Sequence, residues 1–182
     1  MEYIKVKGNS LLGVCSYCTF EDNSFLVSVS NEVAKDYLLN PDKYIYQNNE
    51  IVLNPNYEVQ KLAKAKKDKK EENLNKANEA ILNGYVTYKN CKFETNTDNQ
   101  SNMTATANLM QIQSIEKTQW LSKDNISIEL TLEDFLNIGG LILSYKTNLW
   151  TNVYVGFEAQ IEAAQNIDDV ENIVITYGNM EE

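Results

Sequence analysis

The sequence contains no arginine and no histidine among its 182 residues. Histidine is the commonest general base and metal ligand, and arginine is the usual bidentate ligand of phosphate and guanine. Their absence argues against histidine-dependent catalysis, histidine-ligated metals and sequence-specific DNA recognition. All 16 basic residues are lysine, against 26 Asp and Glu, so the net charge is −10. The abundance of Asn, Lys, Ile and Tyr is typical of an AT-rich genome.

Cysteine is also scarce, with only Cys15, Cys18 and Cys91 in the chain. The first two lie in the stretch GVCSYCTF, which has strand-forming neighbours and no glycine or proline between the thiols. Side chains three apart on a strand point to opposite faces, whereas a metal or redox centre needs both sulfurs on one side. We therefore expect a second strand of a small sheet, with reduced cysteines of which at least one is buried.

No apolar run approaches the roughly 18 residues that cross a bilayer. Residues 1–5 lack the charged-then-apolar layout of a secretory signal, and no glycine-rich phosphate loop is present. These absences predict a protein made in a cytoplasm that binds neither membrane nor cofactor.

The charge is unevenly distributed along the chain. Residues 1–57 carry −3, residues 58–92 carry +4 and residues 93–182 carry −11. An acidic C-terminal half repels nucleic acid, and glutamates dilute the central lysines. We therefore expect no nucleic-acid partner.

The first section has the patterns of a β-rich unit. Alternation at Phe25, Val27 and Val29 indicates a strand, and we expect a small meander. Ser30 is placed to cap a short helix that ends before Pro41. Two β-rich runs on either side of Asn48 and Asn49 then predict a hairpin, since asparagine tolerates left-handed backbone.

Good helix formers dominate residues 58–83, but no leucine, isoleucine, valine or aromatic residue occurs between Ala65 and Leu74. The pattern allows a contact with an anionic surface, and it equally describes a solvated connecting helix, which we favour because lysines and glutamates at i,i+4 usually form such a face. We expect this stretch not to be buried. Gly84 is well placed to end the helix.

The last section begins with a predicted hairpin around Lys89 and Asn90, followed by a helix capped by Asp98 or Asn99. A second hairpin is expected around residues 123–125. Thr131, with Asp134 three residues later, then resembles a capping box. It starts the longest periodic segment, whose apolar residues are Leu132, Phe135, Leu136, Ile142, Leu143, Leu149, Trp150, Val153, Phe157 and Ile161.

This periodicity predicts a long amphipathic helix up to about Asn166, ahead of a short turn capped around residues 168–171 and a final strand or packed tail. Gly139 and Gly140 lie within the helix, so either another element packs closely there or the helix bends.

Together these patterns predict an α+β fold. A small β-rich unit spans residues 1–57, a charged connecting helix spans residues 58–83, and residues 84–182 form short hairpins packed on the long helix.

The order of motifs from Lys76 to Ile173 resembles a domain of unknown function found in tail-region proteins of phages and prophages. The resemblance rests on ILNG, YVTYKNCKFETNTD, TQWLSKDNISIELT, LEDFLNIGGLILSYKTNLW and IEAAQNIDDVENI, in that order. Separately, the stretch VSVSNEVAKDYLLNPDKYIYQNNEIVLNPNYE is similar to the front part of tail-fibre assembly proteins. The chain has lysine and asparagine where many of those proteins have arginine and alanine, so surface contacts need not be shared.

These resemblances imply a non-enzymatic protein that binds a tail fibre, either as an assembly chaperone or as an accessory. It would reside in the host cytoplasm during assembly or in the virion tail. A structural component of the tail or baseplate is the alternative, and a wall-glycan hydrolase is a third possibility. The family has no established catalytic, cofactor-binding or metal-binding residues.

Three carboxylates carry the only enzymatic hypothesis. Glycoside cleavage uses a carboxylate pair, and Glu129, Glu133 and Asp134 lie close in sequence. We favour a capping role for Asp134 and solvent-facing glutamates. The aromatic residues Tyr44, Tyr46, Trp120, Tyr145 and Trp150 offer faces to a partner chain or a sugar, but most are expected to lie in or near the core.

Overall fold

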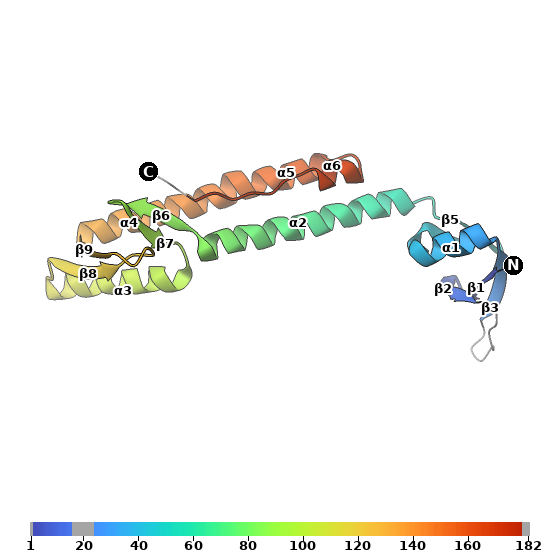
Figure 1. The fold of residues 1–182 in the computed structure, drawn as a ribbon, viewed down its shortest axis with the longest axis horizontal. Helices are drawn as coiled ribbons and strands as arrows, with labels where there is room; N and C mark the ends of the chain where they lie inside the picture. Colours follow the sequence, from blue (N-terminus) through green and yellow to red (C-terminus); the bar gives the residue numbers. More distant parts are fainter. Residues whose placement is uncertain (1, 16–23, 180–182) are drawn as a thin grey trace. The chain divides into compact units, whose positions relative to one another are not determined.

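The computed structural model describes residues 2–15 and 24–179, and its mixture of helices and small antiparallel sheets confirms the α+β class (Figure 1). The chain divides into two compact units, unit 1 over residues 1–64 and unit 2 over residues 65–182. Helix α2 (Tyr57–Asn83) passes from one unit into the other.

Unit 1 contains a three-stranded sheet made of β1 (Glu2–Lys7), β2 (Ser10–Cys15) and β3 (Phe25–Val29). The expected meander is wrong, because β3 pairs with β1 and the strand order is β2-β1-β3. The central position suits β1, since Ile4 and Val6 are fully buried. A strand with neighbours on both sides hides its apolar residues better than an edge strand.

Strand β2 contains the first part of GVCSYCTF and ends at Cys15, as expected for a second strand. Cys15 is disulfide-bonded, so the prediction of reduced cysteines is wrong for this residue. Cys18 lies outside the described residues, and so do residues 21–23, whose Glu, Asp and Asn are typical of a turn.

Helix α1 (Asn31–Leu39) confirms the cap at Ser30, whose side chain accepts a hydrogen bond from the Val33 amide. The short helix η1 (Pro41–Lys43) leads into the hairpin of β4 (Tyr44–Gln47) and β5 (Glu50–Leu53). The turn residues Asn48 and Asn49 have φ of 53° and 68°, which confirms the predicted hairpin. Ile4, Tyr37 and Tyr44 form the core of the unit.

Unit 2 holds two further hairpins, as predicted. Strands β6 (Tyr85–Tyr88) and β7 (Cys91–Glu94) pair around Lys89 and Asn90, and β8 (Lys117–Leu121) pairs with β9 (Ser127–Thr131). Helix α3 (Thr97–Gln113) lies between them. Its cap is Asn96 rather than Asp98 or Asn99, because the Asn96 side chain reaches the Asn99 amide.

The predicted long helix is present as α4 (Leu132–Asn148), a π-helical segment η2 (Leu149–Tyr154) and α5 (Val155–Ala163). Leu149 and Ile161 are both buried although they lie about 3.3 turns apart at 3.6 residues per turn. A π turn takes up an extra residue and so turns α5 back toward the same side. The sequence pattern did not show this register change.

Beyond α5, the short helix α6 (Ile167–Glu171) is capped by Asn166, and an extended tail follows it. The tail is packed rather than free, since Ile175 is buried and Tyr177 lies edge-on to Phe157 with ring centroids 5.8 Å apart. Figure 1 shows the tail running back beside α5.

The core of unit 2 draws on α2, both hairpins, α3, α4 and η2. Its fully or nearly buried members are Ala77, Val86, Cys91, Phe93, Met103, Met110, Leu130, Phe135, Ile138, Ile142, Tyr145 and Leu149. The far end of α2 docks on it through Ala77 and Ile81, whereas Leu74 remains 42% exposed.

Gly84 ends α2 at a position with no room for a side chain. A Cβ there would lie 2.2 Å from the Ala80 carbonyl oxygen and 2.8 Å from Thr95 Oγ1. We expect Gly84→Ala to lower the free energy of unfolding of unit 2 by about 1 to 3 kcal/mol, because backbone atoms must shift. Urea unfolding followed by tryptophan fluorescence measures this, since Trp120 and Trp150 are the two tryptophans of the chain.

The matched control is Gly156→Ala in α5, where, apart from the neighbouring backbone of the helix itself, no atom of the described residues lies within 4 Å of the added Cβ. Alanine favours a helix by up to about 1 kcal/mol over glycine, so this variant should be as stable as the parent or more stable. Equal effects at the two positions would contradict the steric explanation.

Candidate functional site

The three carboxylates of the enzymatic hypothesis have different environments. Asp134 is only 5% exposed, whereas Glu129 and Glu133 are exposed. The capping box is confirmed, since the Thr131 hydroxyl accepts from the Asp134 amide and the Asp134 carboxylate accepts from the Thr131 amide. Asp134 is therefore placed by the first turn of α4.

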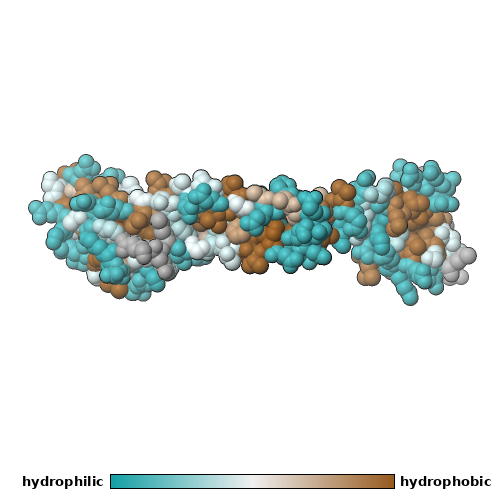
Figure 2. Space-filling model, turned by 90° about the horizontal axis from the view of Figure 1, so that it is seen from above, coloured by the Kyte–Doolittle hydropathy of each residue, from teal (hydrophilic) through white to brown (hydrophobic). Residues whose placement is uncertain are grey.

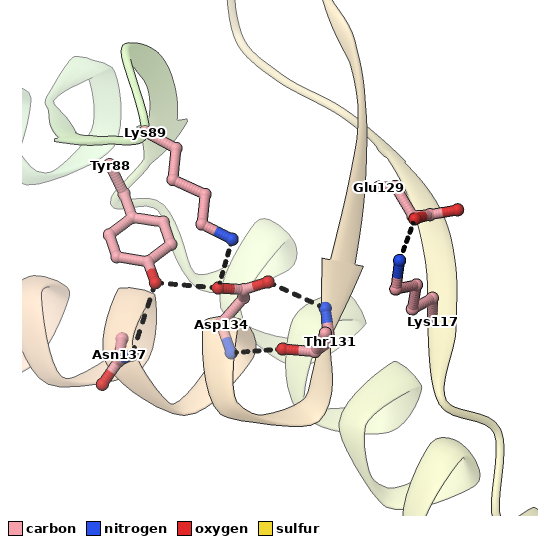
Figure 3. A network of polar contacts seen from close by, with 7 residues as sticks. All are labelled: Tyr88, Lys89, Lys117, Glu129, Thr131, Asp134 and Asn137. Carbon is pink, nitrogen blue, oxygen red and sulfur yellow. Dashed lines mark hydrogen bonds and ion pairs between the residues drawn. The ribbon is translucent and has the colours of Figure 1, made fainter.

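Asp134 also joins α4 to the β6–β7 hairpin (Figure 3). Its carboxylate accepts a hydrogen bond from the Tyr88 hydroxyl at 2.8 Å and forms an ion pair with Lys89 Nζ at 2.7 Å. Asn137 donates to the Tyr88 oxygen at 3.3 Å. Lys89 has a φ of 48° in the tight hairpin turn, which sets the direction of its side chain. We call Tyr88, Lys89, Thr131 and Asp134 the capping network.

The capping network keeps Asp134 ionised. Burial by itself would raise the pKa of Asp134, but the Lys89 ammonium and the hydrogen bonds from Thr131 and Tyr88 outweigh it and hold this pKa well below its usual range. A general acid in glycoside cleavage needs the opposite shift. The favoured role of Asp134 is therefore structural.

Glu129 does not complete a carboxylate pair with Asp134. It forms an ion pair across β8 and β9 with Lys117, at 2.8 Å. Figure 3 shows its carboxylate directed away from Asp134. The two groups therefore do not converge on a common substrate position in this structure.

The aromatic residues considered for recognition pack within the chain. Tyr44 and Tyr145 are buried, and Trp120 lies edge-on to Phe135 with ring centroids 5.4 Å apart. Trp150 packs similarly on Tyr154, and Tyr46 on Phe25. These contacts confirm that most of the five lie in or near a core.

Within residues 2–15 and 24–179, no group of three or more His, Cys, Asp or Glu side chains is arranged to hold a metal ion. Cys91 is a free thiol in the core. None of the helices described is long and apolar enough to cross a membrane.

A second polar network lies on α2, in the stretch predicted not to be buried. That prediction is wrong, because Asn73 is fully buried. Asn73 Nδ2 donates to the Tyr154 carbonyl at 3.2 Å and to Glu158 Oε1 at 3.0 Å, while its Oδ1 accepts from the Tyr177 hydroxyl. Both amide protons and the amide oxygen are thus used, which makes burial of this side chain tolerable.

Three lysines extend this second network along α2. Lys66 donates to the Glu162 carbonyl at 2.7 Å, Lys70 pairs with Glu158 and Glu162, and Lys76 donates to the Ile175 carbonyl at 3.1 Å. Together with Asn73 they form a line at helical spacing, which we call the polar seam. Lysines that the sequence assigned to a solvated helix therefore attach α2 to α5 and to the tail.

Tyr177 attaches the tail to the centre of the polar seam. Burial, together with the nearby Tyr154 and Glu158, raises the pKa of Tyr177 to about 12. Its hydroxyl therefore stays protonated at neutral pH and donates to Asn73. In the sequence, the polar seam is marked only by the helical spacing of Lys66, Lys70 and Asn73. No apolar residue accompanies them, so the sequence does not identify this side of the helix as buried.

Comparison with known proteins gives one match. Residues 64–175 match the family described as Domain of unknown function (DUF4376). The match covers most of unit 2, including the polar seam and the capping network. No curated protein and no solved structure matches the chain.

Asn73 offers a direct test of the polar seam. We expect Asn73→Ala to lower the free energy of unfolding of unit 2 by about 2 to 4 kcal/mol, since it leaves a cavity and removes the partner of Tyr177. Asn75→Ala, at an exposed position of the same helix, should change it by less than about 0.5 kcal/mol. Urea unfolding of both variants measures the difference, and equal stability would contradict the seam.

The lowered pKa of Asp134 predicts a specific pH dependence of the free energy of unfolding. Its pKa is lower in the folded chain than the ordinary value of 3.8, so its contribution is complete above that value and is lost as the pH falls below it. Asp134→Asn should therefore be about 2 kcal/mol less stable at pH 7, and the deficit should shrink on acidification toward pH ~2. A deficit that is independent of pH would show that the ionised carboxylate is not responsible.

Proposed function

The chain belongs to the DUF4376 family, and on this premise we propose that it is a non-enzymatic tail-associated protein of a phage or prophage, which binds a tail fibre as an assembly chaperone or accessory. The matched segment, residues 64–175, nearly coincides with the segment whose motif order resembles tail-region proteins. The observation that carries the proposal is this ordered set of motifs. The fibre partner is suggested by the resemblance of the first section to tail-fibre assembly proteins.

The use of polar residues in unit 2 supports a non-enzymatic role. The pKa of Asp134 is lowered further than that of any other carboxylate in the described residues, and this carboxylate is occupied by helix capping and by Lys89. The buried Asn73 is occupied by η2, α5 and the tail. Ionisable groups with strongly shifted pKa values often mark active sites, but structural ion pairs shift pKa values as well. Here the partners of both residues belong to neighbouring segments of the same unit.

The surface of unit 1 supports protein binding. Leu38 and Leu39 at the end of α1 are 64% and 81% exposed. Leu39 lines an open hollow of about 370 Å³ together with Pro41, Tyr57 and Lys61. Exposed leucines beside a hollow are typical of sites that receive an apolar side chain of another protein. Figure 2 shows apolar groups reaching the surface among hydrophilic ones.

The proposal is tested by co-expressing the full chain with the fibre protein encoded in the same phage or prophage genome and isolating the fibre. We expect a stable complex. Leu39→Glu should weaken it at least about tenfold, because a charge must be desolvated in an apolar contact. Leu82→Glu is the matched control, since Leu82 is 62% exposed but lies in unit 2, and it should bind normally.

Failure of the folded chain to bind the fibre would overturn the fibre-binding proposal. Mass spectrometry of purified particles then separates two roles, since an assembly chaperone should be absent and a built-in tail component should be present. Clearing of host cell walls in a zymogram would overturn the non-enzymatic assignment.

A further inference from the structure

Helix α4 presents apolar and small residues on its outer side. Leu136 and Leu143 are 66% and 68% exposed, and Gly139, Gly140 and Thr147 are exposed between and beyond them. Spacings of three and four residues align these five positions on one side of the helix. The opposite side carries the buried residues Phe135, Ile138, Ile142 and Tyr145. We call the five exposed residues the outer face of α4.

The outer face lies in an uncharged part of an acidic unit. Unit 2 contains ten lysines and eighteen Asp and Glu, a net charge of −8. Residues 135–145 of α4 nevertheless contain no charged residue, and neither do residues 99–115, which include most of α3. A surface suited to a basic partner would carry acidic groups. Near a twofold axis between identical chains, by contrast, any charge meets its like, so an uncharged surface suits a second copy.

The outer face is also self-complementary. Leu136 and Leu143 lie at equal distances in sequence on either side of the pair Gly139 and Gly140. If two α4 helices cross antiparallel about that midpoint, Leu136 of one copy lies opposite Leu143 of the other, and the glycines lie opposite each other. Apart from the neighbouring backbone of α4 itself, no atom of the described residues lies within 4 Å of a Cβ added at Gly139 or Gly140, so the helix backbone is accessible there.

A hollow lies on either side of the glycines. One, of about 370 Å³, lies between α3 and α4 and is lined by Met103, Ala107, Leu136 and Gly139. The other, of about 830 Å³, is lined by Gly140, Leu143, Thr147 and Asn179. Exposed leucines beside hollows on the same surface provide both the projections and the recesses that two helices need to interlock.

We propose that two copies of the chain associate through the outer faces of their α4 helices, which cross antiparallel at Gly139 and Gly140. Within a helix interior, glycine is less favourable than any other residue except proline. The use of two glycines here is explained by the close approach of the second backbone. This association is independent of the fibre, so it is tested without one.

Sedimentation of the full chain at concentrations up to about 100 μM tests the proposal, because this range covers dissociation constants of weak to moderate dimers. We expect a dimer. Leu143→Glu should shift its dissociation constant upward at least tenfold, since it introduces a charge and removes an apolar contact. Leu82→Glu serves as the matched control and should leave the dimer unchanged, with circular dichroism showing that both variants are folded.

The antiparallel geometry has its own test. Adding Leu136→Lys to Leu143→Glu should restore dimerisation, because each new lysine then lies opposite a new glutamate of the other copy. A monomeric parent chain, or a Leu143→Glu variant that dimerises like the parent, would overturn the interface. Loss of the dimer in Leu143→Glu without rescue by the second substitution would overturn the antiparallel arrangement.

Discussion

The hydrogen bonds of the buried Asn73 side chain are the interaction on which the attachment of α2 within unit 2 depends. An amide buried without partners would cost several kcal/mol, so a buried asparagine is tolerated only where all its groups are bonded. Asn73 meets this condition by bonding both α5 and the tail at once. The lysines on either side then extend the attachment, and the stretch of α2 without large apolar residues is fixed without a hydrophobic face.

The capping network applies the same principle at the other end of the unit. Asp134 begins α4 through the capping box and attaches the β6–β7 hairpin through Tyr88 and Lys89. Breaking such a buried pair is costly because it leaves a charge without compensation. Among the described carboxylates of unit 2, Asp134 has the most strongly shifted pKa, and its structural contacts account for that shift. Surfaces are therefore better candidates for function than an active site at Asp134.

Those surfaces are of two kinds. Unit 1 exposes leucines at the end of α1, and unit 2 exposes the outer face of α4. The apolar residues of α4 cover more of the helix surface than its buried side. Leu136 and Leu143 directly follow the buried Phe135 and Ile142, but their side chains are exposed. The proposed fibre contact and the proposed self-association therefore use different units, and each can be disrupted separately.

The sequence by itself determined the α+β class, the hairpins at Asn48–Asn49 and Lys89–Asn90, and the caps at Ser30 and Thr131. These features depend on residues close together in the chain, whose turn and capping preferences are local. It also indicated the capping role of Asp134. Only the tertiary structure decided the strand order β2-β1-β3, the π-helical register change before α5 and the burial of Asn73. Each of these depends on contacts between residues far apart in sequence, such as Asn73 and Tyr177. The sequence around a polar residue does not show whether a distant partner will satisfy its hydrogen bonds.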